Sequence, residues 1–134
     1  MSPDHPQSGL QARWQAVRER VDAACRAAGR DPAEVDILPV SKTFPVEVIR
    51  EAVSFGLHRF GENKVQEAYR KWEALADLTD LRWSVIGHLQ TNKAKLAVDL
   101  FDAIHTVDRP SLAEKLARLG DARGVSPQLF VQVN

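Results

Sequence analysis

Apolar segments typical of β-strands alternate along this chain with amphipathic segments typical of α-helices. Strand-like runs are expected at 35–40, 59–61, 82–86, 101–106 and 129–133. They recur at intervals of roughly twenty to twenty-five residues, with a helix-forming segment between successive runs. Crossover connections of this kind are right-handed and place successive strands parallel in one sheet. The chain is therefore predicted to be an α/β protein.

The helices are predicted from apolar spacing and from cap residues. A first helix is expected over 10–28, where apolar residues recur every three or four positions before Gly29. Further helices are expected at 45–55, 64–76, 91–99 and 108–119, and Gly120 is expected to end the last of them. In the helix that starts at Lys64, Tyr69 and Trp72 are expected on the core-facing side.

Two architectures fit this alternation: a doubly wound sheet and part of a (β/α)8 barrel of the TIM type. The fifth predicted strand is followed by no helix, because the sequence stops at Asn134. A barrel needs about eight strand-helix units, commonly in 200 or more residues. The chain is therefore expected to be truncated after about its fifth strand, with roughly three units missing if it is a barrel, and the pattern alone leaves both architectures open.

Composition narrows the classes of protein that fit. The chain has 134 residues, 44% of them hydrophobic, which suits one globular domain. Eighteen basic residues balance eighteen acidic ones, so no overall field attracts nucleic acid or an anionic membrane. The single cysteine, Cys25, is expected in the core of a protein from a reducing compartment. Residues 1–9 are expected to be flexible and lack the pattern of a secretory signal, so we expect a soluble cytoplasmic protein.

Lys42 follows the first predicted strand at the point where the chain should pass into a helix. Ligand sites of parallel α/β folds lie at the carboxyl ends of the strands, so Lys42 is a candidate site residue. Burial of a lysine ammonium favours the neutral amine, which is the form that attacks aldehydes. Lysines at strand ends also commonly reach solvent without any chemical role, and position alone does not separate these two interpretations.

Other polar residues follow the later strands. Asn63 and His88 come after the second and third strands and could bond to an aromatic ligand or lie against its ring. Glu62 could bind there or cap the next helix. His88 and His105 do not have the spacing of metal ligands, so no metal site is predicted. No nucleotide-binding motif is present either.

Four motifs carry a family resemblance. They are VSKTFP at 40–45, RFGENKVQEA at 59–68, WSVIGHLQTNKAK at 83–95 and IHTVDR at 104–109. In this order, and at matching strand ends, they closely resemble the pyridoxal 5′-phosphate homeostasis protein family. The resemblance covers about residues 35–134.

The resemblance implies a single-domain (β/α)8 barrel, like the amino-terminal domain of alanine racemase, which residues 1–134 would form incompletely at the carboxyl end. It implies that pyridoxal phosphate (PLP) is bound as a Schiff base with Lys42, the lysine of the VSK motif. By position, Asn63, His88 and Asn134 would line the cofactor pocket. The implied role is that of a carrier or regulator of the free cofactor, without robust catalytic turnover. In the family, as in many barrels, the phosphate is held after strands seven and eight, which this sequence does not contain.

Two alternatives remain open at this point. An amino-acid racemase or a lysine-dependent aldolase on the same barrel would need an acid or base opposite Lys42, and His88 and His105 are the candidates. The other alternative is a truncated fragment without independent activity, whose exposed sheet edge drives self-association.

Overall fold

A computed structural model describes residues 6–133, and its helices and strands alternate as predicted. The helices are α1 (Pro6–Ala27), α2 (Val46–Ser54), α3 (Val65–Ala74), α4 (Ala94–Leu100) and α5 (Pro110–Arg123), with 3-10 turns η1 (Pro32–Glu34) and η2 (Thr91–Lys93). The strands are β1 (Arg59–Glu62), β2 (Arg82–Val85), β3 (Ala103–Val107) and β4 (Gln128–Val131). The helix at residues 6–9 occupies part of the segment that was expected to be flexible.

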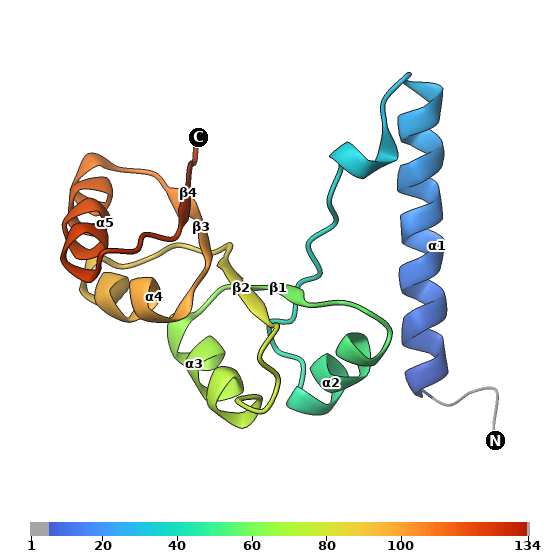
Figure 1. Cartoon of the computed structure of the whole chain (residues 1–134), viewed down its shortest axis with the longest axis horizontal. Helices are drawn as coiled ribbons and strands as arrows, with labels where there is room; N and C mark the ends of the chain where they lie inside the picture. Colours follow the sequence, from blue (N-terminus) through green and yellow to red (C-terminus); the bar gives the residue numbers. More distant parts are fainter. Residues whose placement is uncertain (1–5, 134) are drawn as a thin grey trace.

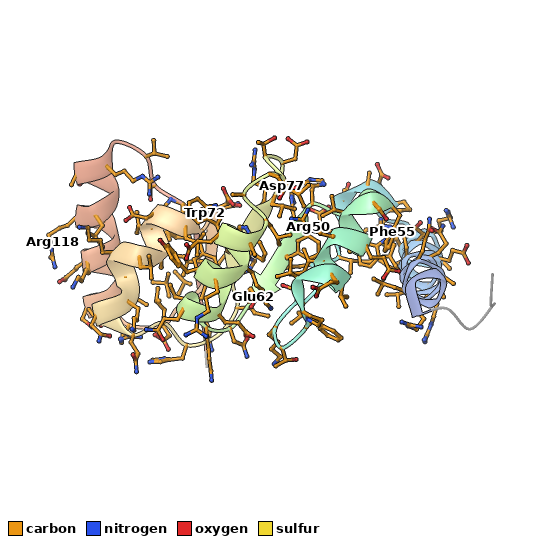
Figure 2. All side chains as sticks on the ribbon, turned by 90° about the horizontal axis from the view of Figure 1, so that it is seen from below. Arg50, Phe55, Glu62, Trp72, Asp77 and Arg118 are labelled. Carbon is orange, nitrogen blue, oxygen red and sulfur yellow. The ribbon has the colours of Figure 1, made fainter. Side chains whose placement is uncertain are left out.

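The four strands form one parallel sheet in the order β1-β2-β3-β4. Helices α2 to α5 follow the sheet along one side, and a view turned by 90° shows all five helices in a row (Figures 1 and 2). A doubly wound sheet would carry helices on both faces. Sequential strand order with the helices on one face is instead the arrangement of the (β/α) barrel class.

The predicted first strand, 35–40, forms only one bridge to the sheet. Val40 pairs in parallel with Gly61, whose N–H donates to Pro39 O at 2.8 Å, while Ser41 N donates to Gly61 O at 3.0 Å. The next rung toward the amino end would need an N–H of residue 39, and proline has none. The expectation of a full strand was therefore wrong, because Pro39 stops the ladder after one rung.

Helix α5 continues past its expected end at Gly120. It runs to Arg123, and Gly124 closes it with φ +81°, the left-handed geometry of a helix-ending glycine. Gly120 is buried, and an added Cβ would lie 3.0 Å from Ser126 Cβ. Its role is therefore to let the chain leading into β4 pass close to the helix.

The outward face of α3 carries two aromatic residues that were expected to face the core. Tyr69 is 37% exposed and Trp72 is 46% exposed, and their rings lie 5.8 Å apart. The buried positions of the helix are Val65, Ala68 and Lys71. A charged residue thus takes a place on the core-facing side, while Trp72 lies at the surface.

The hydrophobic core lies between the sheet and helices α2 to α5. Phe60, Trp83 and Ile104 point into it from three neighbouring strands, and Leu112 and Leu116 cover it from α5. Each of these side chains is at most 3% exposed. This packing fixes which strand residues face the opposite side of the sheet, since side chains alternate along a strand.

Helix α1 packs beside α2, at the end of the row of helices (Figure 1). Leu10 and Trp14 line a small apolar pocket of about 110 Å³ together with residues of α2. Cys25 is buried, as predicted for a small core side chain. No helix within residues 6–133 is long and apolar enough to cross a membrane.

Candidate functional site at the carboxyl edge of the sheet

Lys42 lies in a tight turn between the Val40 bridge and helix α2. Phe44 N donates to Ser41 O at 3.1 Å, which closes the turn. Thr43 has φ +66°, a left-handed conformation that is strained for a β-branched residue. The Lys42 side chain is exposed, as in the second of the two interpretations, in which a lysine at a strand end reaches solvent. The amine is accessible to a ligand at this edge.

A buried polar network lies directly beneath the turn. Lys71 Nζ donates to Glu62 Oε2 at 2.8 Å and to the backbone oxygen of Ser41 at 2.6 Å. The hydroxyl of Ser41 also donates to Glu62 Oε2. Glu62 is fully buried and Lys71 is 8% exposed. Glu62 therefore braces the Lys42 turn and does not cap α3, one of the roles considered for it.

This network was not predicted from the sequence. The available signal was a charged residue on an apolar helix face: Lys71 lies three residues after Ala68 and four before Leu75, and both of these are buried. A lysine at such a position needs a buried partner. The sequence alone does not show that the partner is Glu62.

Asn63 and His88 lie together at the ends of β1 and β2, as predicted. Both line a pocket of about 280 Å³. Its other lining residues are Lys64, Val65, Gln66, Leu89, Gln90 and Lys93. Lys42 does not line this pocket; the Val40–Gly61 bridge places it beside the segment that follows β1.

Gly87 allows the two sides of this pocket to meet. An added Cβ at Gly87 would lie 2.9 Å from the backbone oxygen of Asn63 and 3.0 Å from its Cα. The carbonyl of Gly87 in turn accepts a hydrogen bond from the Thr106 hydroxyl at 2.7 Å. The absence of a side chain here therefore serves the close approach of two backbone segments.

Arg109 holds the loop that carries His88. Its guanidinium donates to Leu89 O at 2.6 Å, to the Thr91 hydroxyl at 3.2 Å and to Asp108 at 2.7 Å. His88 Nδ1 lies 3.9 Å from the other oxygen of Asp108. The ends of β2 and β3 are thus linked by charged side chains beside the pocket.

His105 lies on the open face of the sheet, away from the helices. Its ring stacks on Phe130 with centroids 4.6 Å apart and an interplanar angle of 17°. Both line a hollow of about 570 Å³, together with Arg59, Arg82 and Asp102 near the amino ends of the strands. Burial lowers the pKa of His105 below its ordinary value of 6.5. Within residues 6–133, no group of three or more His, Cys, Asp or Glu side chains could hold a metal ion.

The candidate residues Lys42, Asn63 and His88 therefore lie along the carboxyl edge, whereas His105 lies in a different hollow. The predicted site residue Asn134 lies outside the described residues.

Comparisons with known proteins support the resemblance that the motifs suggest. The chain is 43% identical over 122 residues to the pyridoxal phosphate homeostasis protein of Aquifex aeolicus, covering 91% of this chain and 53% of that protein. It is 45% identical over 119 residues to the protein of the same name from Pseudomonas aeruginosa, covering 88% of this chain and 51% of that protein. The resemblance to the pyridoxal phosphate homeostasis proteins is confirmed. The chain spans about half the length of these curated relatives.

Solved structures agree with this result. PipY of Synechococcus elongatus PCC7942, solved with PLP bound, superposes with a TM-score of 0.76 at 45% identity, covering 85% of this chain and 54% of PipY. An unknown protein from Bifidobacterium adolescentis superposes with a TM-score of 0.84 at 30% identity, covering 96% of this chain and 56% of that protein. No protein-family model matches the chain. The sequence thus resembles the pyridoxal phosphate homeostasis proteins, and the fold resembles that of PLP-bound PipY.

Proposed function

We propose that this chain binds pyridoxal 5′-phosphate in the cytoplasm and takes part in controlling the free cofactor, without robust catalytic turnover. The observation that carries the proposal is the turn at Lys42: an exposed lysine follows Ser41, which a buried network holds, at the edge of a sheet that superposes on PLP-bound PipY. The names of the curated relatives support the homeostatic role.

The residues present suit an aromatic aldehyde that carries a phosphate. Lys42 offers an accessible primary amine, and Asn63 and His88 offer hydrogen-bonding groups in the neighbouring pocket. Lys64 and Lys93 add positive charge around the same pocket, which suits an anionic ligand. We propose Lys42, Asn63, His88 and Asn134 as the cofactor-binding residues.

The cofactor supplies an electrophilic aldehyde carbon, and we propose that Lys42 binds it as a Schiff base. The new bond joins Nζ to the aldehyde carbon, and the aldehyde oxygen leaves as water. This linkage masks the aldehyde reversibly, which is sufficient for a carrier. The chain's own contribution is then to hold the Lys42 amine at the edge of the sheet and to orient the ring through Asn63 and His88.

Borohydride trapping tests this function directly. The chain would be mixed with PLP and reduced, and the modified peptide would be located by mass spectrometry. We expect selective labelling of Lys42 among the six lysines, and loss of that label in Lys42→Ala. Lys95→Ala is the matched control, because Lys95 is exposed and does not line the pocket. Labelling spread evenly over the lysines, or an equal yield from Lys42→Ala, would contradict the proposal.

Exchange of an amino acid's α-proton with solvent distinguishes a carrier from a racemase. A racemase on this site would exchange the α-proton of an amino acid with solvent, and Lys42 and a second acid or base would both be required. We expect no Lys42-dependent deuterium exchange into alanine in the presence of PLP. Clear exchange that Lys42→Ala abolishes would instead favour the racemase.

A further inference from the structure

A buried ion pair lies in the otherwise apolar layer between the sheet and helix α3. Glu62 Oε2 and Lys71 Nζ are 2.8 Å apart, with side-chain exposures of 0% and 8%. Desolvation of two such charges commonly costs as much free energy as their attraction returns, so an apolar pair of similar volume is often at least as stable. A role in stabilising the packing of α3 on the sheet therefore does not explain why two charged residues are buried here.

The remaining hydrogen bonds of the pair go to the residue just before Lys42. The backbone oxygen of Ser41 accepts from Lys71 Nζ at 2.6 Å, and the Ser41 hydroxyl donates to Glu62 Oε2. Ser41 is itself 5% exposed. The ion pair thus bonds to both the backbone oxygen and the hydroxyl of Ser41. Lys71 and Ser41 are 30 residues apart in the sequence.

A third charged side chain holds the residue just after Lys42. Glu67 Oε1 accepts a hydrogen bond from Thr43 N at 3.0 Å and lies 3.7 Å from Lys71 Nζ. This bond helps to maintain Thr43 in its left-handed conformation, which a threonine adopts only when its surroundings impose it. The backbone is therefore tied down on both sides of Lys42 to side chains that meet at Lys71.

We infer that Lys71, together with Glu62 and Glu67, is a positioning residue for Lys42. The three side chains hold the Ser41–Thr43 turn in a strained shape that presents the Lys42 amine at the carboxyl edge of the sheet. This inference rests on the proposed function of Lys42 in binding the PLP aldehyde. Lys71 is buried and its amine donates to Glu62 and to the Ser41 backbone oxygen, so we assign the reacting amine to the exposed Lys42.

The test is a double variant, Glu62→Leu with Lys71→Met, in the full chain. It removes both buried charges at once, so neither is left without a partner, and the fold should keep its thermal stability. Arg50→Met is the matched control. It breaks the exposed ion pair between Arg50 of α2 and Asp77 in the turn after α3 (Figure 2), which shares no residue with the network at Ser41.

Two measurements are made on each variant. Amide hydrogen exchange of the segment 41–44 reports the order of the turn without any cofactor. Borohydride trapping with PLP then reports the fraction of label on Lys42. For the double variant we expect exchange in this segment to rise at least about tenfold, which is the change implied by the loss of one charge-assisted hydrogen bond. We also expect several-fold weaker labelling of Lys42, with Arg50→Met unchanged in both.

Unchanged exchange in the double variant would overturn the inference, and so would faster exchange with undiminished Lys42 labelling. Failure of the wild-type chain to label Lys42 would contradict the proposed function, whereas the exchange comparison would still decide whether the network orders the turn. Should the double variant not fold, Glu67→Ala gives the same test at a partly exposed position. It removes the acceptor for Thr43 N, and Glu67→Gln should restore it.

Discussion

Lys71 and Glu62 meet beneath the Lys42 turn, with Nζ and Oε2 2.8 Å apart. The second oxygen of Glu62 is buried without a hydrogen-bond partner. This carboxylate is completely enclosed. Among the described residues, Lys71 supplies the only opposite charge within 4 Å of it. The stability of the region should therefore depend on keeping both charges or neither.

Lys71→Met alone should destabilise the chain strongly. It leaves Glu62 buried without an opposite charge, which typically costs about 3–5 kcal/mol. The double variant Glu62→Leu/Lys71→Met should instead have unchanged or higher stability, by up to about 4 kcal/mol. Urea unfolding followed by circular dichroism gives both free energies of unfolding. Equal stability of Lys71→Met and the double variant would contradict this prediction and would mean that water reaches Glu62.

Gly87→Ala should disturb the pocket that Asn63 and His88 share. The added Cβ would lie 2.9 Å from the Asn63 backbone oxygen, so two backbone segments must separate, at a cost of about 1–3 kcal/mol. We also expect weaker trapping of PLP on Lys42. Gly61→Ala is the matched control. Its new Cβ would contact only side-chain atoms of Ile86 and Leu38, at 3.2–3.4 Å. We expect this substitution to lower the free energy of unfolding by less than about 1.5 kcal/mol. Equal losses in the two variants would contradict this account.

The order of the elements was predictable from the sequence because side-chain periodicity directly reflects which face of each element is buried. The exception is the segment 35–40. Its apolar composition is that of a strand, yet Pro39 has no N–H to donate to a second rung. Hydrophobicity predicted a strand here, and hydrogen bonding limits its pairing with the sheet to the single Val40–Gly61 bridge.

The site was predictable only in part. The placement of Lys42, Asn63 and His88 at one edge follows from parallel topology, since the carboxyl ends of all strands meet there. The brace beneath Lys42 does not follow, because Ser41 and Lys71 are 30 residues apart and no local pattern pairs them. The exposure of Lys42 was also not predictable, since it depends on the direction of a strained turn at Thr43.

His105 should make the stability of the fold depend on pH. Burial lowers its pKa in the folded state below the usual 6.5, so the unfolded chain binds a proton more readily. Above about pH 6.5 His105 is neutral in the folded and the unfolded chain, and the free energy of unfolding does not depend on its protonation. As the pH drops from there through the folded pKa, protonation favours the unfolded chain and stability falls. Thermal unfolding between pH 5 and pH 8 measures this slope. His105→Phe keeps the ring stacked on Phe130 and should lose this part of the slope, while His58→Phe, at an exposed histidine, should retain it.

The β4 edge of the sheet should promote self-association. β4 pairs with β3 on one side, and no further strand covers its other side among residues 6–133. Its apolar side chains are open to solvent: Phe130 is 40% exposed and Val131 is 79% exposed. Exposed apolar edges of this kind pair with other chains, and an edge lysine opposes such pairing.

We expect light scattering across a dilution series to show association that Val131→Lys reduces. Val17→Lys, at a 49% exposed valine on α1, should leave it unchanged. A monomer at every concentration, or an equal effect of the two lysine variants, would show that the edge does not drive association.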